Sequence, residues 1–346
     1  MWPTGPCRSR GPIHAAKEAP VVTSLTKAQS GGPQGGVPPA AWAGSNRRIG
    51  DRVFSGTATA AGISILVALA AVAAFLVIEG FPALVADGED LPGGRGFLAF
   101  VGPLLFGTVL AATIGLVVAT PLSIGIALFI SHYAPRRISQ GLGYLVDLLA
   151  AVPSVVYGLW GIAFLAPQLV PVFRWLESTL GFLPFFAGPA TSGRTMLTAG
   201  LVLAVMILPI MTAVNREVFL QTPRLQEEAS LALGATKWEM IRMTVLPFGA
   251  SGVVSGSMLG LGRALGETLA VALVLAGSNI YSINVISTTN SNTIAANIAL
   301  DFPEASGLAV NALIASGLVL FILTFLVNYL ARAIVARRRE FSGANA

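Results

Sequence analysis

Six apolar runs set the fold class of this chain. Each is near or above the ~20 residues that a helix needs to cross a bilayer. They cover residues 58–78, 103–130, 145–166, 196–214, 251–277 and 309–330. Only 11% of the residues are charged, whereas a soluble domain carries about 25%. The sequence therefore predicts an all-α polytopic membrane protein with six transmembrane helices.

The second run is too long for one straight span. It contains Pro121, and a proline inside a helix usually bends or interrupts it. We expect either a kink at this proline or an interfacial helix at the end of the run.

Residues 1–48 differ from the rest of the chain. They hold a Pro/Gly-rich run at 31–39, scattered cations and no sustained periodicity. This composition predicts a disordered N-terminal extension ahead of a transmembrane domain at 49–340. The extension could have no role or could be a regulatory tail, and its composition fits both. Because the segment lacks the short apolar core of a cleavable signal peptide, we expect the first span to act as an uncleaved signal.

The basic residues predict the orientation of the spans. If the N-terminus lies inside, every Lys and Arg falls on the inner side except Arg95, Arg174 and Arg194, which lie outside, and Arg263, which lies within the membrane. This asymmetry is the positive-inside pattern. We therefore expect both termini to be cytoplasmic, and we interpret the net charge of +5 as a topology signal rather than a nucleic-acid-binding patch.

The residues needed for catalysis or metal binding are scarce. The single cysteine, Cys7, and the two histidines, His14 and His132, fall outside every apolar run. A disulfide framework, a thiolate metal site and an intramembrane hydrolase are therefore excluded. The chain also lacks a Gly-x-x-x-x-Gly-Lys-Ser/Thr phosphate loop, so any ATP chemistry belongs to another polypeptide.

Two outer segments have distinctive compositions. Residues 167–195 are rich in prolines and aromatics, which suits a compact interfacial hairpin. Residues 278–293 are almost all Ser, Thr and Asn around Tyr281 and Ile283. The second segment fits a docking surface or a polar vestibule, and a plain solvated loop is the favoured interpretation.

The inner loop at residues 215–250 begins with a predicted short helix. Thr222 is expected to cap this helix, whose first residue would be Pro223. Gly234 is expected to close it in a left-handed conformation, because glycine adopts positive φ without a steric cost.

A second short helix is predicted in the same loop. Thr236 and Glu239, three residues apart, form a capping box at its start, and Pro247 is expected to end it. Two capped helices joined at a glycine make a rigid, charged hairpin beneath the membrane. The hairpin is either a plain connector or a docking element for a cytoplasmic partner.

Two ionisable residues, Arg263 and Glu267, lie inside the fifth apolar run. If the span begins at Ser251 as one helix, Arg263 lies about 18 Å along it, near the middle of the hydrocarbon core. The i, i+4 spacing would place both side chains on one face, where they can touch. Such residues usually face a bundle interior or a water-filled path. The pair is therefore either part of a substrate pathway or an internally neutralised structural pair.

Glycines form two stripes along the fifth run. Gly252, Gly256 and Gly260 lie four residues apart, and Gly262 and Gly266 form the second stripe. Small residues at this spacing let helices approach closely. The packing partner is open: a second subunit and a helix of the same chain both fit.

The inner loop resembles the EAA loop of ABC importer permeases. The matching residues are Glu228, Ala229, Ser230, Gly234, Leu246 and Pro247. Ser230 replaces the second alanine of the motif, and Thr244 stands where isoleucine is usual. In that family the loop forms coupling helices that seat in the ATPase subunit, so the resemblance implies this role for the six residues.

Two further stretches resemble the phosphate-specific permeases of this superfamily. Residues 259–271 read Leu-Gly-Leu-Gly-Arg-Ala-Leu-Gly-Glu-Thr-Leu-Ala-Val, and residues 151–161 read Ala-Val-Pro-Ser-Val-Val-Tyr-Gly-Leu-Trp-Gly. Leu-Ala-Val after Gly-Glu-Thr is similar to the PstC type, whereas the PstA type tends to have Ala-Pro-Leu there. The resemblance covers roughly residues 50–335.

This resemblance implies a non-catalytic permease subunit of a type I ABC importer for inorganic phosphate, located in the cytoplasmic (inner) membrane. It would pair with a PstA-like permease, two PstB-like ATPase subunits and an extracytoplasmic PstS-like phosphate-binding protein. The chain itself would bind no cofactor, since the ATPase hydrolyses ATP with magnesium. Arg263 and Glu267 match positions implicated in phosphate passage in the family.

Two alternatives remain open. The substrate could be another oxyanion. The protein could also be an ion-coupled secondary carrier, which is less favoured because such a carrier does not need the EAA-like loop and because no inverted half-repeat is visible.

Overall fold

The computed structural model describes residues 49–91, 93–94, 96–189 and 191–341. The chain divides into two units, residues 1–64 and 65–346. Only residues 49–64 of the first unit are described, and they form the beginning of helix α1 (Ile49–Val85). The predicted disorder of residues 1–48 lies outside the described residues and stays a prediction.

The described part of the chain is almost entirely helical. After α1 the elements are η1 (Gly88–Asp90), α2 (Phe97–Leu128), η2 (Phe129–Tyr133), α3 (Arg136–Ala150), α4 (Ser154–Trp160), η3 (Gly161–Leu165), α5 (Ala166–Leu180), η4 (Pro184–Phe186), α6 (Met196–Leu220), α7 (Arg224–Ala232), α8 (Lys237–Met240), η5 (Ile241–Val245), α9 (Leu246–Leu265), α10 (Leu269–Val274), β1 (Gly277–Ser278), β2 (Asn290–Ser291), α11 (Ile294–Asp301) and α12 (Leu308–Phe341). Elements η2, η3 and η5 are π-helical turns. The two short strands pair in parallel.

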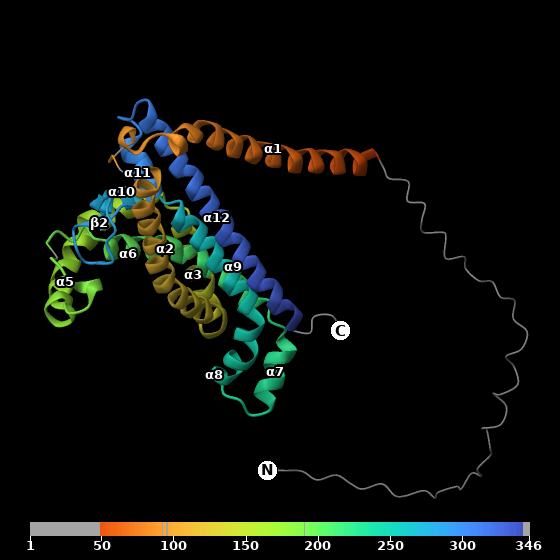
Figure 1. The fold of residues 1–346 in the computed structure, drawn as a ribbon. Helices are drawn as coiled ribbons and strands as arrows, with labels where there is room; N and C mark the ends of the chain where they lie inside the picture. Colours follow the sequence, from red (N-terminus) through yellow and green to blue (C-terminus); the bar gives the residue numbers. More distant parts are fainter. Residues whose placement is uncertain (1–48, 92, 95, 190, 342–346) are drawn as a thin grey trace, which may run out of the picture. The chain divides into compact units, whose positions relative to one another are not determined.

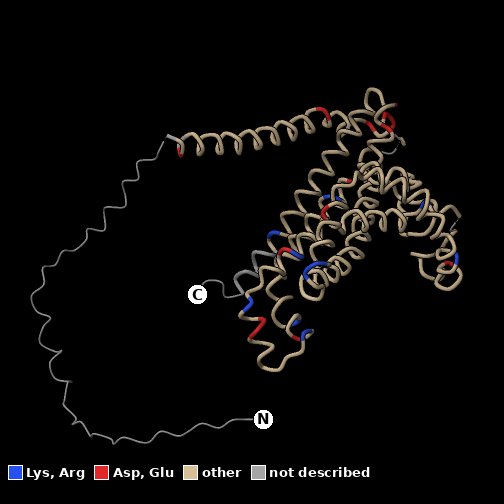
Figure 2. The backbone as a smooth tube through the Cα atoms, turned by 180° about the vertical axis from the view of Figure 1, so that it is seen from behind, with Lys and Arg blue, Asp and Glu red and all other residues tan. Residues whose placement is uncertain are grey.

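Six helical segments are long and apolar enough to cross a membrane. They are Val53–Val85, Phe97–Tyr133, Ser154–Leu180, Met196–Leu220, Lys237–Leu265 and Leu308–Ala333. Charged residues are sparse within them: α2 carries none and α9 carries only Arg263. Figure 2 shows the long helices of the second unit mostly without coloured positions. The prediction of an all-α protein with six apolar spans is confirmed.

Helices α2, α6 and α9 form the centre of the second unit (Figure 1). The most extensive helix contact joins α2 to α6, and α9 packs against both of them. Gly115 lies against Leu203, and Gly200 lies against Ile114. Because glycine has no Cβ, the backbones of α2 and α6 approach closely at these two positions. The largest buried cluster surrounds this contact.

The third span differs from its predicted range of 145–166. The chain leaves the helix after α3 and re-enters it at Ser154, with Pro153 as the N-cap. A proline disfavours helical geometry in the residue before it and tolerates a helix start after it. The apolar segment then continues without a break to Leu180. The expected interfacial hairpin at 167–195 is therefore wrong for its first half, which belongs to the span.

The second span runs through Pro121 as one helix and ends in the π-helical turn η2. A wider turn at a helix end accommodates backbone groups that a regular helix would leave unpaired. The long apolar run is thus used as a single helical segment that ends at Tyr133.

The fifth span also differs from its predicted range of 251–277. Pro247 does not end the preceding helix, because the π-helical turn η5 lies directly before it and the chain stays helical from Lys237 to Leu265. Local π-helical adjustment is one way in which a membrane helix accommodates proline. The segment then stops at its other end, where Gly266 is the C-cap of α9.

The polar segment at 278–293 is not a plain solvated loop. Its first part is exposed at Tyr281, but Ser287, Asn290 and Ser291 are buried. The main-chain carbonyl of Val285 accepts a hydrogen bond of 2.8 Å from Leu197 at the start of α6. The segment folds back into the protein, so the solvated-loop interpretation is wrong.

The first glycine stripe of α9 faces α6 of the same chain. A Cβ at Gly252 would overlap the side chain of Val218, and a Cβ at Gly260 would lie 2.8 Å from Sδ of Met211. By contrast, a Cβ at Gly262 would meet nothing within 4 Å. The first stripe therefore packs within the chain.

This contrast predicts opposite effects of two alanine substitutions. Gly252→Ala is expected to lower the free energy of unfolding by about 1–3 kcal/mol, because the added methyl group forces Val218 to move. At Gly262 the added methyl group has open space around it. Gly262→Ala is therefore expected to be neutral or stabilising, since alanine is more favourable than glycine in a helix by about 1 kcal/mol. Thermal unfolding of the two variants in detergent measures the difference. A Gly252→Ala variant as stable as Gly262→Ala would contradict the packing described here.

Candidate functional site

Arg263 lies in the last turn of α9, and Glu267 lies beyond the end of that helix. Because the helix stops at Gly266, the two side chains do not share a helical face. No ion pair joins them, nor joins Arg263 to any other carboxylate, among the residues that the structure describes. The predicted i, i+4 contact between Arg263 and Glu267 is therefore wrong.

Glu267 is engaged by the next helix instead. Its side chain is only 8% exposed, and Oε1 accepts a hydrogen bond of 3.2 Å from the main-chain N–H of Ala270 in the first turn of α10. A carboxylate at a helix start satisfies amides that have no partner within the helix. The charge of Glu267 is thus stabilised by α10 and not by Arg263.

Arg263 has no such partner. Its side chain is half-buried, and its Nε is fully buried without a hydrogen-bond partner. A cation in an apolar segment without a counter-ion is costly. An anion from outside this chain would remove that cost, and the structural-pair interpretation loses its main support.

The position of Arg263 along the bundle follows from its packing. Three residues before it, Gly260 lies against Met211 and Ile207 of α6. These two residues lie near the middle of α6. The expectation of one helix starting at Ser251 is wrong, and Arg263 lies near the end of its own helix, but its packing places it level with the middle of α6.

Two more arginines, which the sequence analysis did not single out, have buried Nε atoms without partners. Arg194 lies just before α6 and donates a hydrogen bond of 3.4 Å from Nη2 to the carbonyl of Leu273 in the last turn of α10. Arg216 lies near the other end of α6, with its guanidinium against Gly143 of α3. The three guanidiniums thus follow α6 from one end to the other. The only sequence signal for Arg194 is its place directly before an apolar run.

Two buried polar side chains lie in the part of the chain that follows α10. Asn290 and Asn297 are buried, and the Oδ1 atom of each has no hydrogen-bond partner. Helix α11, which carries Asn297, packs against α10. The high density of Ser, Thr and Asn at 278–293 marks a polar segment in the sequence, but it does not predict that these side chains are buried.

The predicted helical hairpin is present and consists of α7 and α8. Gly234 has φ +89°, so the predicted left-handed closure is confirmed. The capping box of Thr236 and Glu239 is also confirmed, with both reciprocal hydrogen bonds formed. The predicted cap at Thr222 is wrong. Pro223 is the N-cap, and Thr222 Oγ1 is buried without a partner.

The hairpin exposes the residues that resemble the EAA motif. Glu228, Ala229 and Gly234 are exposed, whereas Ser230 is half-buried and donates a hydrogen bond of 2.8 Å to the carbonyl of Glu227. Leu246 is half-buried and Pro247 exposed, in the first turn of α9. Large apolar side chains are exposed beside them: Leu225, Leu231, Leu233 and Trp238. Clustered exposed apolar side chains are typical of a protein-binding surface.

Comparison with known proteins gives the family. Residues 119–340 match the family model described as the binding-protein-dependent transport system inner membrane component. The chain belongs to this family. As a member of it with six apolar spans, the chain is a multi-pass inner-membrane protein. The matched range includes the hairpin, Arg263 and Glu267.

Two relatives are similar to this chain over most of their own length. The chain is 50% identical over 301 residues to phosphate transport system permease protein PstC 2 of Mycobacterium tuberculosis, covering 83% of this chain and 92% of that protein. It is 48% identical over 278 residues to phosphate transport system permease protein PstC of Mycobacterium leprae, covering 77% of this chain and 87% of that protein.

A solved structure has a similar fold. A chain of a bacterial ABC transporter involved in the import of the acidic polysaccharide alginate gives a TM-score of 0.54 at 17% sequence identity, covering 82% of this chain and 96% of that one. At this identity the likeness concerns the fold alone. It confirms that the helices have the arrangement of an ABC importer permease.

Proposed function

We propose that this chain is the permease subunit of an ATP-driven importer that carries inorganic phosphate across the inner membrane. The observation that carries the proposal is Arg263, a partly buried cation level with the middle of α6, with no anionic partner among the described residues. A guanidinium presents a planar fork that matches two oxygens of a phosphate group. The names of the PstC relatives support phosphate over other oxyanions.

In this proposal the chain's own residues give the anion a path along α6. Arg194 lies at one end, Arg263 near the middle and Arg216 near the other end, and each has an unpartnered Nε. Conduction requires sites that bind strongly enough to admit an ion and weakly enough to release it. Glu267, held at the start of α10, adds a nearby negative charge. That charge keeps Arg263 from trapping the anion.

The partners follow from the family and from the hairpin. We propose that α7 and α8 seat in a PstB-like ATPase, supported by the exposed EAA-like residues and by the exposed Leu225, Leu233 and Trp238. ATP and magnesium would be handled by that subunit. A PstA-like permease would complete the membrane part, and a PstS-like binding protein would deliver phosphate from the opposite side. The chain itself would be non-catalytic.

The proposal places both termini and the hairpin in the cytoplasm, as the distribution of Lys and Arg favours. In a Cys7→Ser background, single cysteines at Asp90 and Glu340 would lie on opposite sides of the membrane. An impermeant thiol reagent added to intact cells is expected to label the cysteine at 90 and not the one at 340. The reverse pattern would invert the topology.

Reconstitution tests the function directly. The chain, co-purified with its companion permease and ATPase and placed in liposomes with the binding protein, is expected to take up radiolabelled phosphate only when ATP is present. Excess sulfate should not compete. Competition by sulfate would favour another oxyanion, and uptake that an ionophore abolishes without any need for ATP would favour a secondary carrier.

A further inference from the structure

The π-helical turn η2 at the end of α2 touches both helices of the hairpin. Nε2 of His132 lies 3.4 Å from Oε1 of Glu227 in α7. The neighbouring ring of Tyr133 lies beneath Nζ of Lys237 in α8, which is 4.9 Å from the ring centroid. Successive residues of a helical turn point in directions about 100° apart. This divergence lets two adjacent side chains reach two different helices.

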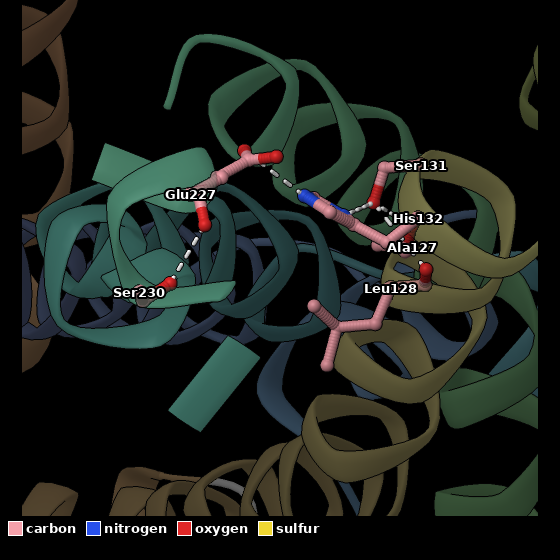
Figure 3. A network of polar contacts seen from close by, with 6 residues as sticks. All are labelled: Ala127, Leu128, Ser131, His132, Glu227 and Ser230. Carbon is pink, nitrogen blue, oxygen red and sulfur yellow. Dashed lines mark hydrogen bonds and ion pairs between the residues drawn. The ribbon is translucent and has the colours of Figure 1, made fainter. Parts of the chain in front are cut away.

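The imidazole of His132 is held from both sides. Figure 3 shows it between the Ser131 hydroxyl and the carboxylate of Glu227. Oγ of Ser131 lies 2.6 Å from Nδ1 and 2.8 Å from the carbonyl of Ala127. The side chain of His132 is 8% exposed and that of Glu227 is 22% exposed. In the tautomer that carries a hydrogen on Nε2, this N–H donates to Glu227 in a largely dry setting, where such a contact is stronger than at a solvated surface.

An apolar cluster lies beside these polar contacts. Ala127 and Leu128 at the end of α2 are buried together with Phe219 of α6, with Met240 at the end of α8, and with Ile241 and Val245 of η5. Close-packed interiors have low compressibility and transmit displacement. The cluster and the two polar contacts together join the hairpin to α2.

We propose that His132 and Tyr133 are positioning residues that transmit movement of the hairpin to α2. This inference rests on the proposed function. Because α2 has its most extensive contact with α6, a displacement of the hairpin would reach the helix along which the three arginines lie. His132 fixes α7 through Glu227, and Tyr133 fixes α8 through Lys237. Turns of this π-helical kind often occur at functional sites.

The test uses the reconstituted importer and measures phosphate imported per ATP hydrolysed. Each of Glu227→Gln and Tyr133→Leu is expected to lower this ratio about two- to fivefold, as expected for the loss of one partly buried ionic or cation–π contact. Combining Glu227→Gln with Tyr133→Leu should lower it about tenfold. Tyr133→Phe keeps the ring face and should retain the wild-type ratio. Asp147→Asn, which removes an exposed carboxylate on α3, is the matched control.

Charge exchange separates transmission from general stability. His132→Glu places two carboxylates together and should lower the ratio, and adding Glu227→Lys should restore it. Loss of ATPase co-purification in every variant, or an unchanged ratio in Glu227→Gln and Tyr133→Leu, would overturn the inference. A wild-type complex that hydrolyses ATP but imports no phosphate would instead overturn the proposed function.

A distance measurement tests the inference without any substrate. In a Cys7→Ser background, spin labels at Val117 of α2 and Leu231 of α7, both exposed, report whether the two elements move as one body. The wild-type distance is expected to be the same with and without ATP. In the Glu227→Gln, Tyr133→Leu double variant the distance should change when ATP binds. A distance that changes in the wild type, or that stays fixed in the variant, would overturn the inference whatever the substrate.

Discussion

Replacing Arg263 with glutamine is expected to reduce phosphate uptake about a hundredfold or more, while the complex still assembles. Glutamine keeps much of the length and polarity but loses the charge and the planar fork. Losing one partner of a buried charged contact costs about 2–5 kcal/mol. Uptake into liposomes, together with the yield of the purified complex, measures the two effects separately.

The structure sharpens this prediction, because Glu267 does not depend on Arg263. Its carboxylate is bound to the amide of Ala270, so the single variant leaves no newly unpaired carboxylate. Assembly should therefore be normal without a compensating change. The double variant Arg263→Gln, Glu267→Gln should assemble and remain inactive. A structural pair would instead give a double variant that regains both assembly and near-normal uptake, and that outcome would refute the substrate-pathway assignment.

Two further variants calibrate the result. Arg263→Lys keeps a point charge but loses bidentate geometry, so uptake should fall less than in Arg263→Gln. Arg174→Gln removes an exposed arginine of α5 and should leave uptake unchanged. Equal loss in Arg174→Gln would mean that the effect reflects total charge rather than position.

Local sequence patterns predicted the parts of this molecule that local chemistry determines. The six apolar runs became six spans, and Thr236 with Glu239 formed the expected capping box. Gly234 adopted the expected positive φ. Each of these features depends on residues that are close together in the sequence, so the pattern alone was sufficient.

The predictions that failed depended on helix breaks or on distant partners. Hydropathy averages over a run, so it did not detect that α9 stops at Gly266 or that η5 carries the helix past Pro247. The polar segment before α11 looked solvated because its partners are remote. Asn284, for example, donates a hydrogen bond of 3.0 Å from Nδ2 to the carbonyl of Gly188, 96 residues away. No local pattern encodes such a contact.

Gly234→Val is expected to lower ATP-dependent uptake and ATPase co-purification about tenfold or more. A Cβ at this position would meet nothing within 4 Å, so the effect cannot come from lack of space. It comes from φ of +89°, which costs a residue with a Cβ about 1–2 kcal/mol and is least tolerated by β-branched residues. The strain would displace α7 relative to α8 and so distort the surface that we propose seats in the ATPase.

Two isosteric variants separate backbone strain from charge. Asparagine and aspartate tolerate positive φ better than other residues with a side chain. Gly234→Asn should therefore retain most uptake. Gly234→Asp has the same shape but adds a negative charge beside Leu233 and Trp238, which are exposed on the proposed interface. A larger loss in Gly234→Asp than in Gly234→Asn would locate the partner at the hairpin. If Gly234→Val matched the wild type in both uptake and ATPase co-purification, the hairpin would be only a connector.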